Sequence, residues 1–150
     1  MSYKNGEILI AEQVEAVNGF SGVNVGRGTK WRLLNSGDAD HYVVLRKGQH
    51  TEAFETKTQK ERRYRTVIEV LQQVSEDLTD RYDDLLGYAD AITDRLDKYW
   101  QLADTTGDIV DANVSGGDEV KEVWIRDVLA WIKVEIFVDW LEVVNVVFAE

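Results

Sequence analysis

The chain closes with a run that is apolar at nearly every position, WIKVEIFVDWLEVVNVVFAE (131–150). Eight of the eighteen residues 131–148 are Ile or Val, and apolar side chains alternate with a set that includes Lys133, Glu135 and Asp139. Because β-branched residues favour strands and successive side chains of a strand point to opposite faces, we predict a strand that is buried on both faces. A helix over the same residues is the competing interpretation.

Two further features of the second half concern the places where strands end. The alternation slips after Leu141, which predicts a bulge or a new element at 142–144. Upstream, DIVDANVSGGDE (108–119) predicts a short strand that ends at Gly116-Gly117.

A long helix is predicted between residues 78 and 99. Apolar residues recur there at steps of three and four, while Asp and Arg occupy the other side. This period indicates one stripe packed on a sheet and one face in water. Ser75, Glu76 and Asp77 supply a cap and negative charge at its start.

The first half predicts smaller elements. A helix over 7–17 ends at Asn18-Gly19, and a short extended segment follows at 23–28. A mostly buried strand is expected at 41–47 and a clearly alternating strand at 62–74. The polar segment between them, 48–61, is expected to be a mobile hairpin loop.

These elements define one α+β domain over residues 1–150. We expect a mostly antiparallel, twisted β-sheet with the helix of about 78–99 and the N-terminal helix packed on one face. The chain has no cysteine, which excludes a disulfide framework and thiolate chemistry. It shows no signal-peptide pattern and no apolar run of membrane-spanning length, so we expect a soluble protein made in the cytoplasm.

Charge is unevenly placed along the chain. The net charge is -11, which argues against a protein that wraps nucleic acid. Ten Lys and Arg lie between Arg27 and Arg65, whereas the second half is strongly acidic. A solvated surface explains this split, and so does head-to-tail association, in which basic and acidic surfaces of neighbouring copies meet.

No catalytic, cofactor or metal site is predicted. His41 and His50 have no nucleophile or metal ligand at motif spacing, and the glycines of 24–31 lack the P-loop and dinucleotide spacings. The acidic residues of 104–119 do not match a calcium loop. Five tryptophans remain, and Trp124 and Trp131 fit an interface nearly as well as a core. These features favour an assembly protein over an enzyme.

The order of the elements resembles the tail terminator (tail completion) proteins of long-tailed bacteriophages. The likeness covers most of the chain: VNGFSGVNVGRG, the strand HYVVLRKG, a charged loop, RRYRTVIEVLQQV, the helix YDDLLGYADAITDRLDKYW, GDIVDANVSG and a last apolar strand. The ordered pattern carries the resemblance, above all the Gly-Arg turn, the VVL-x-x-G strand (43–48) and the LL-x-x-ADAI-x-x-x-L helix (85–96).

The resemblance implies a structural virion protein rather than an enzyme. Such a protein forms a homo-oligomeric ring, expected to be a hexamer, on the head-proximal end of the tail tube. It ends tube polymerisation and joins the tail to the head. The implied partners are other copies of the chain, the tail tube protein and a head-closure or connector protein, with no cofactor and no membrane. DNA passes through the lumen without specific binding.

Two sets of residues follow as expectations from this reading. The loop expected to dock on the tube contains Gln49, His50, Thr51, Glu52, Phe54, Lys57 and Lys60. The expected subunit interface contains Arg63, Arg65, Trp131, Lys133, Glu135, Phe137, Asp139 and Leu141. One face of the last strand should then lie on the helix of 78–99 and the other on a neighbouring subunit.

Two other classes remain open. A head-tail connector or head-closure protein of the same virion would share this size, charge and ring-forming habit. A small ligand-binding α+β domain is the third reading, and a deep pocket with convergent polar groups would favour it.

Overall fold

A computed structural model describes residues 3–28, 39–54, 59–74, 78–99 and 109–145, and the side chains of 50–59 and 144–145 are outside this description. The described residues contain two helices and five strands, in the order α1 (Tyr3–Glu15), β1 (Val25–Arg27), β2 (His41–Phe54), β3 (Gln59–Gln73), α3 (Leu78–Lys98), β4 (Ile109–Ile125) and β5 (Val128–Asn145).

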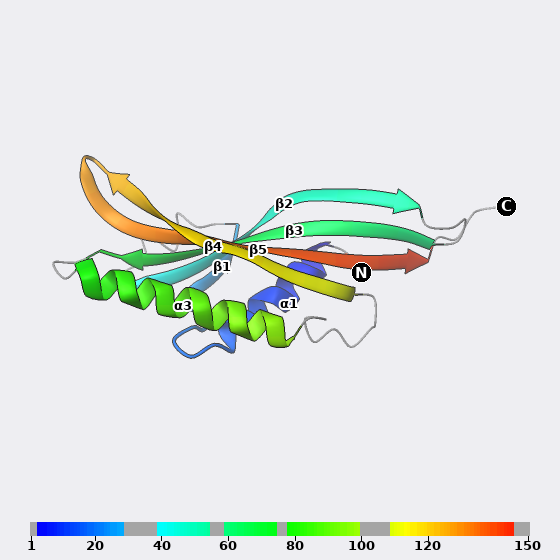
Figure 1. Cartoon of the computed structure of the whole chain (residues 1–150), viewed down its shortest axis with the longest axis horizontal. Helices are drawn as coiled ribbons and strands as arrows, with labels where there is room; N and C mark the ends of the chain where they lie inside the picture. The colour runs from blue at the N-terminus through cyan, green and yellow to red at the C-terminus, as the bar shows by residue number, and fades with distance from the viewer. Residues whose placement is uncertain (1–2, 29–38, 55–58, 75–77, 100–108, 146–150) are drawn as a thin grey trace.

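The five strands form one sheet with the order β1-β2-β3-β5-β4 (Figure 1). Only β1 pairs in parallel, over three residues of β2, and the other three ladders are antiparallel. The expected α+β domain, with a mostly antiparallel sheet and two helices, is therefore confirmed.

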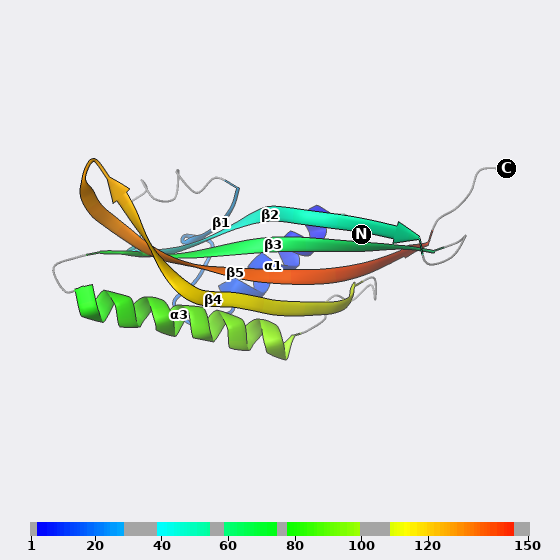
Figure 2. The same cartoon turned by 45° about the horizontal axis from the view of Figure 1, so that its top comes forward.

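Both helices lie on the same side of the sheet (Figures 1 and 2). One large core cluster joins Ile10 and Val14 of α1, Leu85 and Ile92 of α3, and the even-numbered residues of β5 from Ile132 to Trp140. Burial of this apolar surface is the main stabilising contribution to the fold. The opposite face carries no helix among the described residues, and we call it the open face.

The packing of α1 against the sheet depends on close aromatic contacts. Tyr3 stacks on Trp140 with ring centroids 5.9 Å apart, and its hydroxyl donates to Glu7 Oε2 at 2.5 Å. Burial and that hydrogen bond raise the pKa of Tyr3. A Cβ on Gly6 would lie 2.2 Å from the Trp140 ring, so only glycine allows this approach. These contacts begin the helix at Tyr3, four residues before the predicted start.

The strand prediction for the last segment is confirmed, and the competing helix is wrong. Ile132, Val134, Ile136, Val138 and Trp140 are all buried against the helices. The bulge predicted at 142–144 is also wrong, because β5 stays in register with β3 through Asn145. The irregularity lies on the partner strand instead, between Ile109 and Asp111 of β4.

The loop predicted over 48–61 is a second error. β2 continues to Phe54 and β3 begins at Gln59, so residues 48–54 and 59–61 are strand, and 55–58 lie outside the described residues. The register of the β2–β3 pairing shifts between Lys47 and His50. Gly48 lies at this shift, and a Cβ added there would meet Arg65 at 2.9 Å. Backbone pairing with β3 explains a strand that side-chain polarity did not indicate.

The strand predicted to end at Gly116-Gly117 runs on to Ile125. Both glycines have positive φ, at 85° and 79°, where other residues are strained. They accommodate a register shift between Gly116 and Val120, after which pairing with β5 resumes. The long helix predicted at 78–99 is confirmed as α3, and its predicted cap at 75–77 lies outside the described residues.

Candidate functional site on the open face

The open face gathers the residues predicted for the subunit interface. Arg63 and Arg65 of β3 pair with Leu141 and Asp139 of β5, and the remaining members are odd-numbered residues of β5. Alternation of side chains therefore places the set on the side opposite the helices. The predicted residues form one continuous row, but whether a neighbouring subunit covers it remains a prediction.

An apolar cluster occupies one end of the open face. Tyr42, Val44, Leu71 and Trp131 are buried together, and the Tyr42 and Trp131 rings lie 5.6 Å apart. Trp131 is only 5% exposed in the single chain. This member of the predicted interface is therefore largely covered by its own chain, since Tyr42 packs against it.

Charged side chains cross the middle of the open face. Glu69, which is 2% exposed, accepts a hydrogen bond from Arg46 Nε at 3.1 Å. Glu135 accepts one from Lys121 Nζ, also at 3.1 Å, which raises the pKa of Lys121. Lys133 Nζ lies 3.9 Å from Glu69 and 3.8 Å from Glu135. We call these five residues the charged row.

The charged row spans all four long strands. Arg46 comes from β2, Glu69 from β3, Lys133 and Glu135 from β5, and Lys121 from β4. Three cations face two carboxylates, and the side chains of Lys133 and Glu135 are only 19% and 16% exposed. A face that only met water would gain little from holding these side chains together, because exposed ion pairs contribute at most about 1 kcal/mol.

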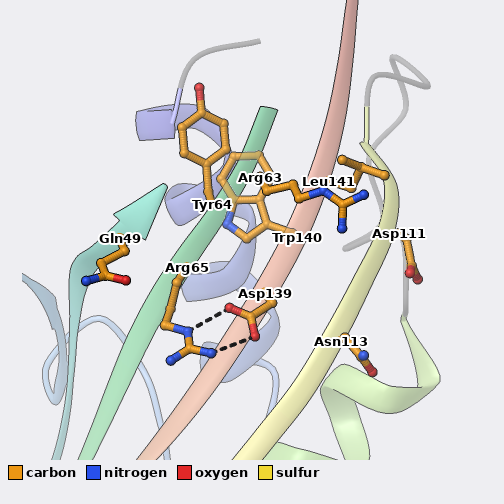
Figure 3. A pocket seen from close by; sticks show the side chains of 9 residues that line it. All are labelled: Gln49, Arg63, Tyr64, Arg65, Asp111, Asn113, Asp139, Trp140 and Leu141. Atoms are coloured by element: carbon orange, nitrogen blue, oxygen red, sulfur yellow. Dashed lines mark hydrogen bonds and ion pairs between the residues drawn. The ribbon is translucent and has the colours of Figure 1, made fainter. Parts of the chain in front are cut away.

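A shallow cavity of about 470 Å³ lies farther along the open face (Figure 3). Arg65 forms a two-pronged ion pair with Asp139, at 2.7 and 3.0 Å, and Asp139 raises the pKa of Arg65. The Arg65 guanidinium also lies 4.9 Å from the centre of the Phe137 ring. The lining residues come from β2, β3, β5 and β4: Gln49, Arg63, Tyr64, Arg65, Asp111, Asn113, Asp139, Trp140 and Leu141.

The charged side chains at this cavity are paired within the chain. Arg63 and Arg65 are exposed, and their neighbours Glu61 and Asp139 neutralise them within the chain. The described residues contain no group of three metal-ligating side chains. The arrangement places the Arg65–Asp139 ion pair beside Phe137, which is half-buried on the same face.

The β4–β5 hairpin extends the sheet beyond the apolar cluster, at the end opposite the cavity (Figure 1). Its two-residue turn, Arg126-Asp127, has φ of 50° and 64°, the left-handed values that a tight hairpin needs. Trp124, Ile125 and Val128 flank the turn and are 57%, 45% and 63% exposed. The sequence indicated that Trp124 could lie at an interface, and the structure leaves it exposed in the single chain.

The predicted tube-docking residues are only partly described. Gln49 is exposed on β2 and lines the cavity, and Lys60 lies on β3 opposite Val144. The backbones of His50, Thr51, Glu52 and Phe54 belong to β2, whereas Lys57 is outside the described residues. The prediction that this segment docks on a tube therefore stays a prediction.

A second polar cluster, around His41, was missed by the sequence analysis. Its Nδ1 lies 2.7 Å from Asp40 Oδ1 and its Nε2 lies 2.7 Å from the Gly19 carbonyl oxygen. The ring stacks on Tyr88 of α3 at 4.5 Å. The hydrogen bond from His41 holds the pKa of Asp40 below its usual value. Both ring nitrogens are engaged, so His41 fastens the start of β2 to the turn after α1.

Comparison with protein-family models gives no match for this chain, and comparison with curated proteins gives none either. In the described part of the chain, neither helix is long and apolar enough to cross a bilayer.

Proposed function

We propose that this chain is a structural subunit that associates with copies of itself into a ring, and that the ring caps the head-proximal end of a phage tail tube. The open face is the observation that carries the proposal. It is a sheet surface without a helix layer in the described chain, and it joins an apolar cluster, the charged row and the Arg65–Asp139 pair.

The fold supports this proposal in a specific way. The resemblance to tail terminator proteins implies a small α+β subunit, and the observed fold is an α+β sheet with both described helices on one face. One face of β5 lies on α3 and α1, and its other face carries no helix in the described chain. Interfaces of this kind combine aromatic and Arg side chains with a polar rim, as Phe137, Arg65 and Asp139 do here.

Charging the open face tests the proposal. Phe137 and Leu141 are half-buried on this face. Replacing both with Asp should therefore leave the chain folded but weaken its association with a neighbouring copy. We expect the double variant to retain its circular dichroism while losing the ring in light scattering, measured with and without tube protein. Ala91→Asp, at an exposed position of α3, is the matched control and should assemble normally.

Function is read from the length of tail tubes assembled in the presence of the protein. The wild type should limit tube growth, and the double variant should allow overlong tubes. A wild-type chain that stays monomeric and leaves tube length unchanged would contradict the proposal. Loss of the circular dichroism signal in the double variant would instead assign Phe137 and Leu141 to the core.

A further inference from the structure

The sheet has two long edges without a neighbouring strand among the described residues. β1 pairs with β2 only at Val43–Leu45, so no described strand pairs with the outer edge of β2 from Arg46 to Phe54. β4 forms the other edge along its whole length. Uncovered edges present free backbone N–H and C=O groups and pair readily with another strand.

The regular part of the β4 edge lies level with the uncovered part of β2. β4 pairs without interruption over Asp111–Gly116, opposite Leu141–Ile136 of β5. Those β5 residues pair with Arg63–Ile68 of β3, which in turn lie opposite Leu45–Thr51 of β2. A closed ring relates its subunits by rotation alone, with no shift along the ring axis. Where the strands run along that axis, the two edges that join must therefore lie at the same height.

Strand direction also suits a head-to-tail junction. Three antiparallel ladders separate β2 from β4, so the two edge strands run in opposite directions within one chain. A second copy in the same orientation would therefore bring its β2 antiparallel to β4 of the first. The antiparallel ladder is the slightly more stable arrangement per residue.

The two edges differ in charge as well. β1, β2 and β3 together contain seven Lys and Arg against three Asp and Glu, whereas β5 and β4 contain two against seven. The charge split seen along the sequence thus becomes a split across the sheet. Pairing β4 with β4 would set like charges opposite each other, while pairing β4 with β2 sets opposite charges together.

We propose that neighbouring copies join through these edges, with β4 of one chain around Asp111–Gly116 pairing antiparallel with β2 of the next around Arg46–Thr51. This inference rests on the proposed ring and names the surface that closes it. The sheet then continues from subunit to subunit, so the open faces of adjacent copies lie side by side and their charged side chains come close together at the junction. The β4 register shifts on both sides of Asp111–Gly116 limit the pairing to this stretch.

Cysteine crosslinking tests the junction directly, because the chain has no cysteine of its own. Gln49 and Asn113 are exposed, one on each edge. Within one chain they are separated by three strand spacings, about 14 Å, which is too far for a disulfide. Between chains, the proposed pairing brings them together. Q49C/N113C should therefore form a covalent ladder beyond the dimer on mild oxidation, ending at the closed ring.

The single variants Q49C and N113C are the matched controls and should form no ladder. A second double variant, Q49C/S115C, samples the pairing two residues along the strand and guards against a small error in register. Q49C/A91C, with one cysteine on α3, should not form a ladder. Circular dichroism of each variant confirms that the fold is retained.

The outcomes separate this inference from the proposed function. A ring in light scattering without a ladder from either edge-to-edge variant would overturn the edge junction and leave the ring proposal standing. Dimers from N113C alone would show that β4 meets β4, which also overturns it. A wild-type chain that stays monomeric with tube protein present would overturn both.

Discussion

The two faces of the sheet are built from the same strands but cover their apolar side chains in different ways. On β5, Ile136 is fully buried beneath the helices, whereas its neighbour Phe137 is only half-buried on the open face. The helix side excludes water with aliphatic and aromatic side chains. The open side covers its apolar groups with charged ones, as Arg65 covers Phe137. The difference teaches that an apolar strand need not be buried on both faces by its own chain.

The open face is also unusual for a surface that meets only water. It holds Glu69 almost fully buried, and burial of a charge is costly unless cations compensate it. Arg46 and Lys133 provide that compensation. The helix face therefore depends on packing and the open face on paired charge, and mutations should separate the two contributions.

The largest expected effect comes from truncating the helix side. Ile136→Ala removes a fully buried side chain and leaves a cavity, which should lower the free energy of unfolding by about 2–5 kcal/mol. Phe137→Ala on the adjacent position should cost markedly less, because its ring is only partly buried. Urea denaturation of both variants measures the difference. Equal losses would mean that the two faces contribute alike.

Removing the buried charge should have an intermediate effect. Glu69→Gln keeps the shape of the side chain but loses a charged hydrogen bond from Arg46, worth about 1.5–3 kcal/mol at most. Since Arg46 is 45% exposed and water can solvate it, the lower end is expected. Glu119→Gln, an exposed position on β4, is the control and should change stability little. A stabilised Glu69→Gln would instead show that desolvation outweighs the pairing.

The sequence predicted the helix side well because its signals are local. The three-and-four spacing of α3 and the alternation of β5 each lie within one element, and both were confirmed. The extension of β2 to Phe54 was missed because its polar residues are held by backbone pairing with β3, which no local pattern records. The strand through Gly116-Gly117 was cut short for the same reason.

The candidate site was predictable in membership but not in arrangement. Alternation along β5 and β3 identified Arg65, Phe137 and Asp139 as residues of one face. Glu69 and Glu135 have their partners Arg46 and Lys121 on strands far apart in sequence, so the charged row appears only when register is known. The His41 cluster was missed similarly, because Gly19, Asp40 and Tyr88 meet only through the fold.

Breaking the Arg65–Asp139 pair should have the smallest effect on the stability of the single chain. The same change allows that stability to be compared with the stability of the assembly. Both side chains are nearly half exposed, so Asp139→Asn should lower the free energy of unfolding by less than about 1 kcal/mol, and added salt should reduce the difference further.

The same substitution should act more strongly on association if a neighbour covers the open face. When a neighbour excludes water from a charge pair, each charge depends more on the other. Truncating one member then costs about 2–5 kcal/mol of binding free energy, since the other charge is left buried alone. Asp139→Asn should therefore lower the free energy of unfolding in urea only slightly. It should weaken the ring, measured by light scattering, much more. An effect equally small in both measurements would mean that the open face stays in water, and that the ring closes without covering it.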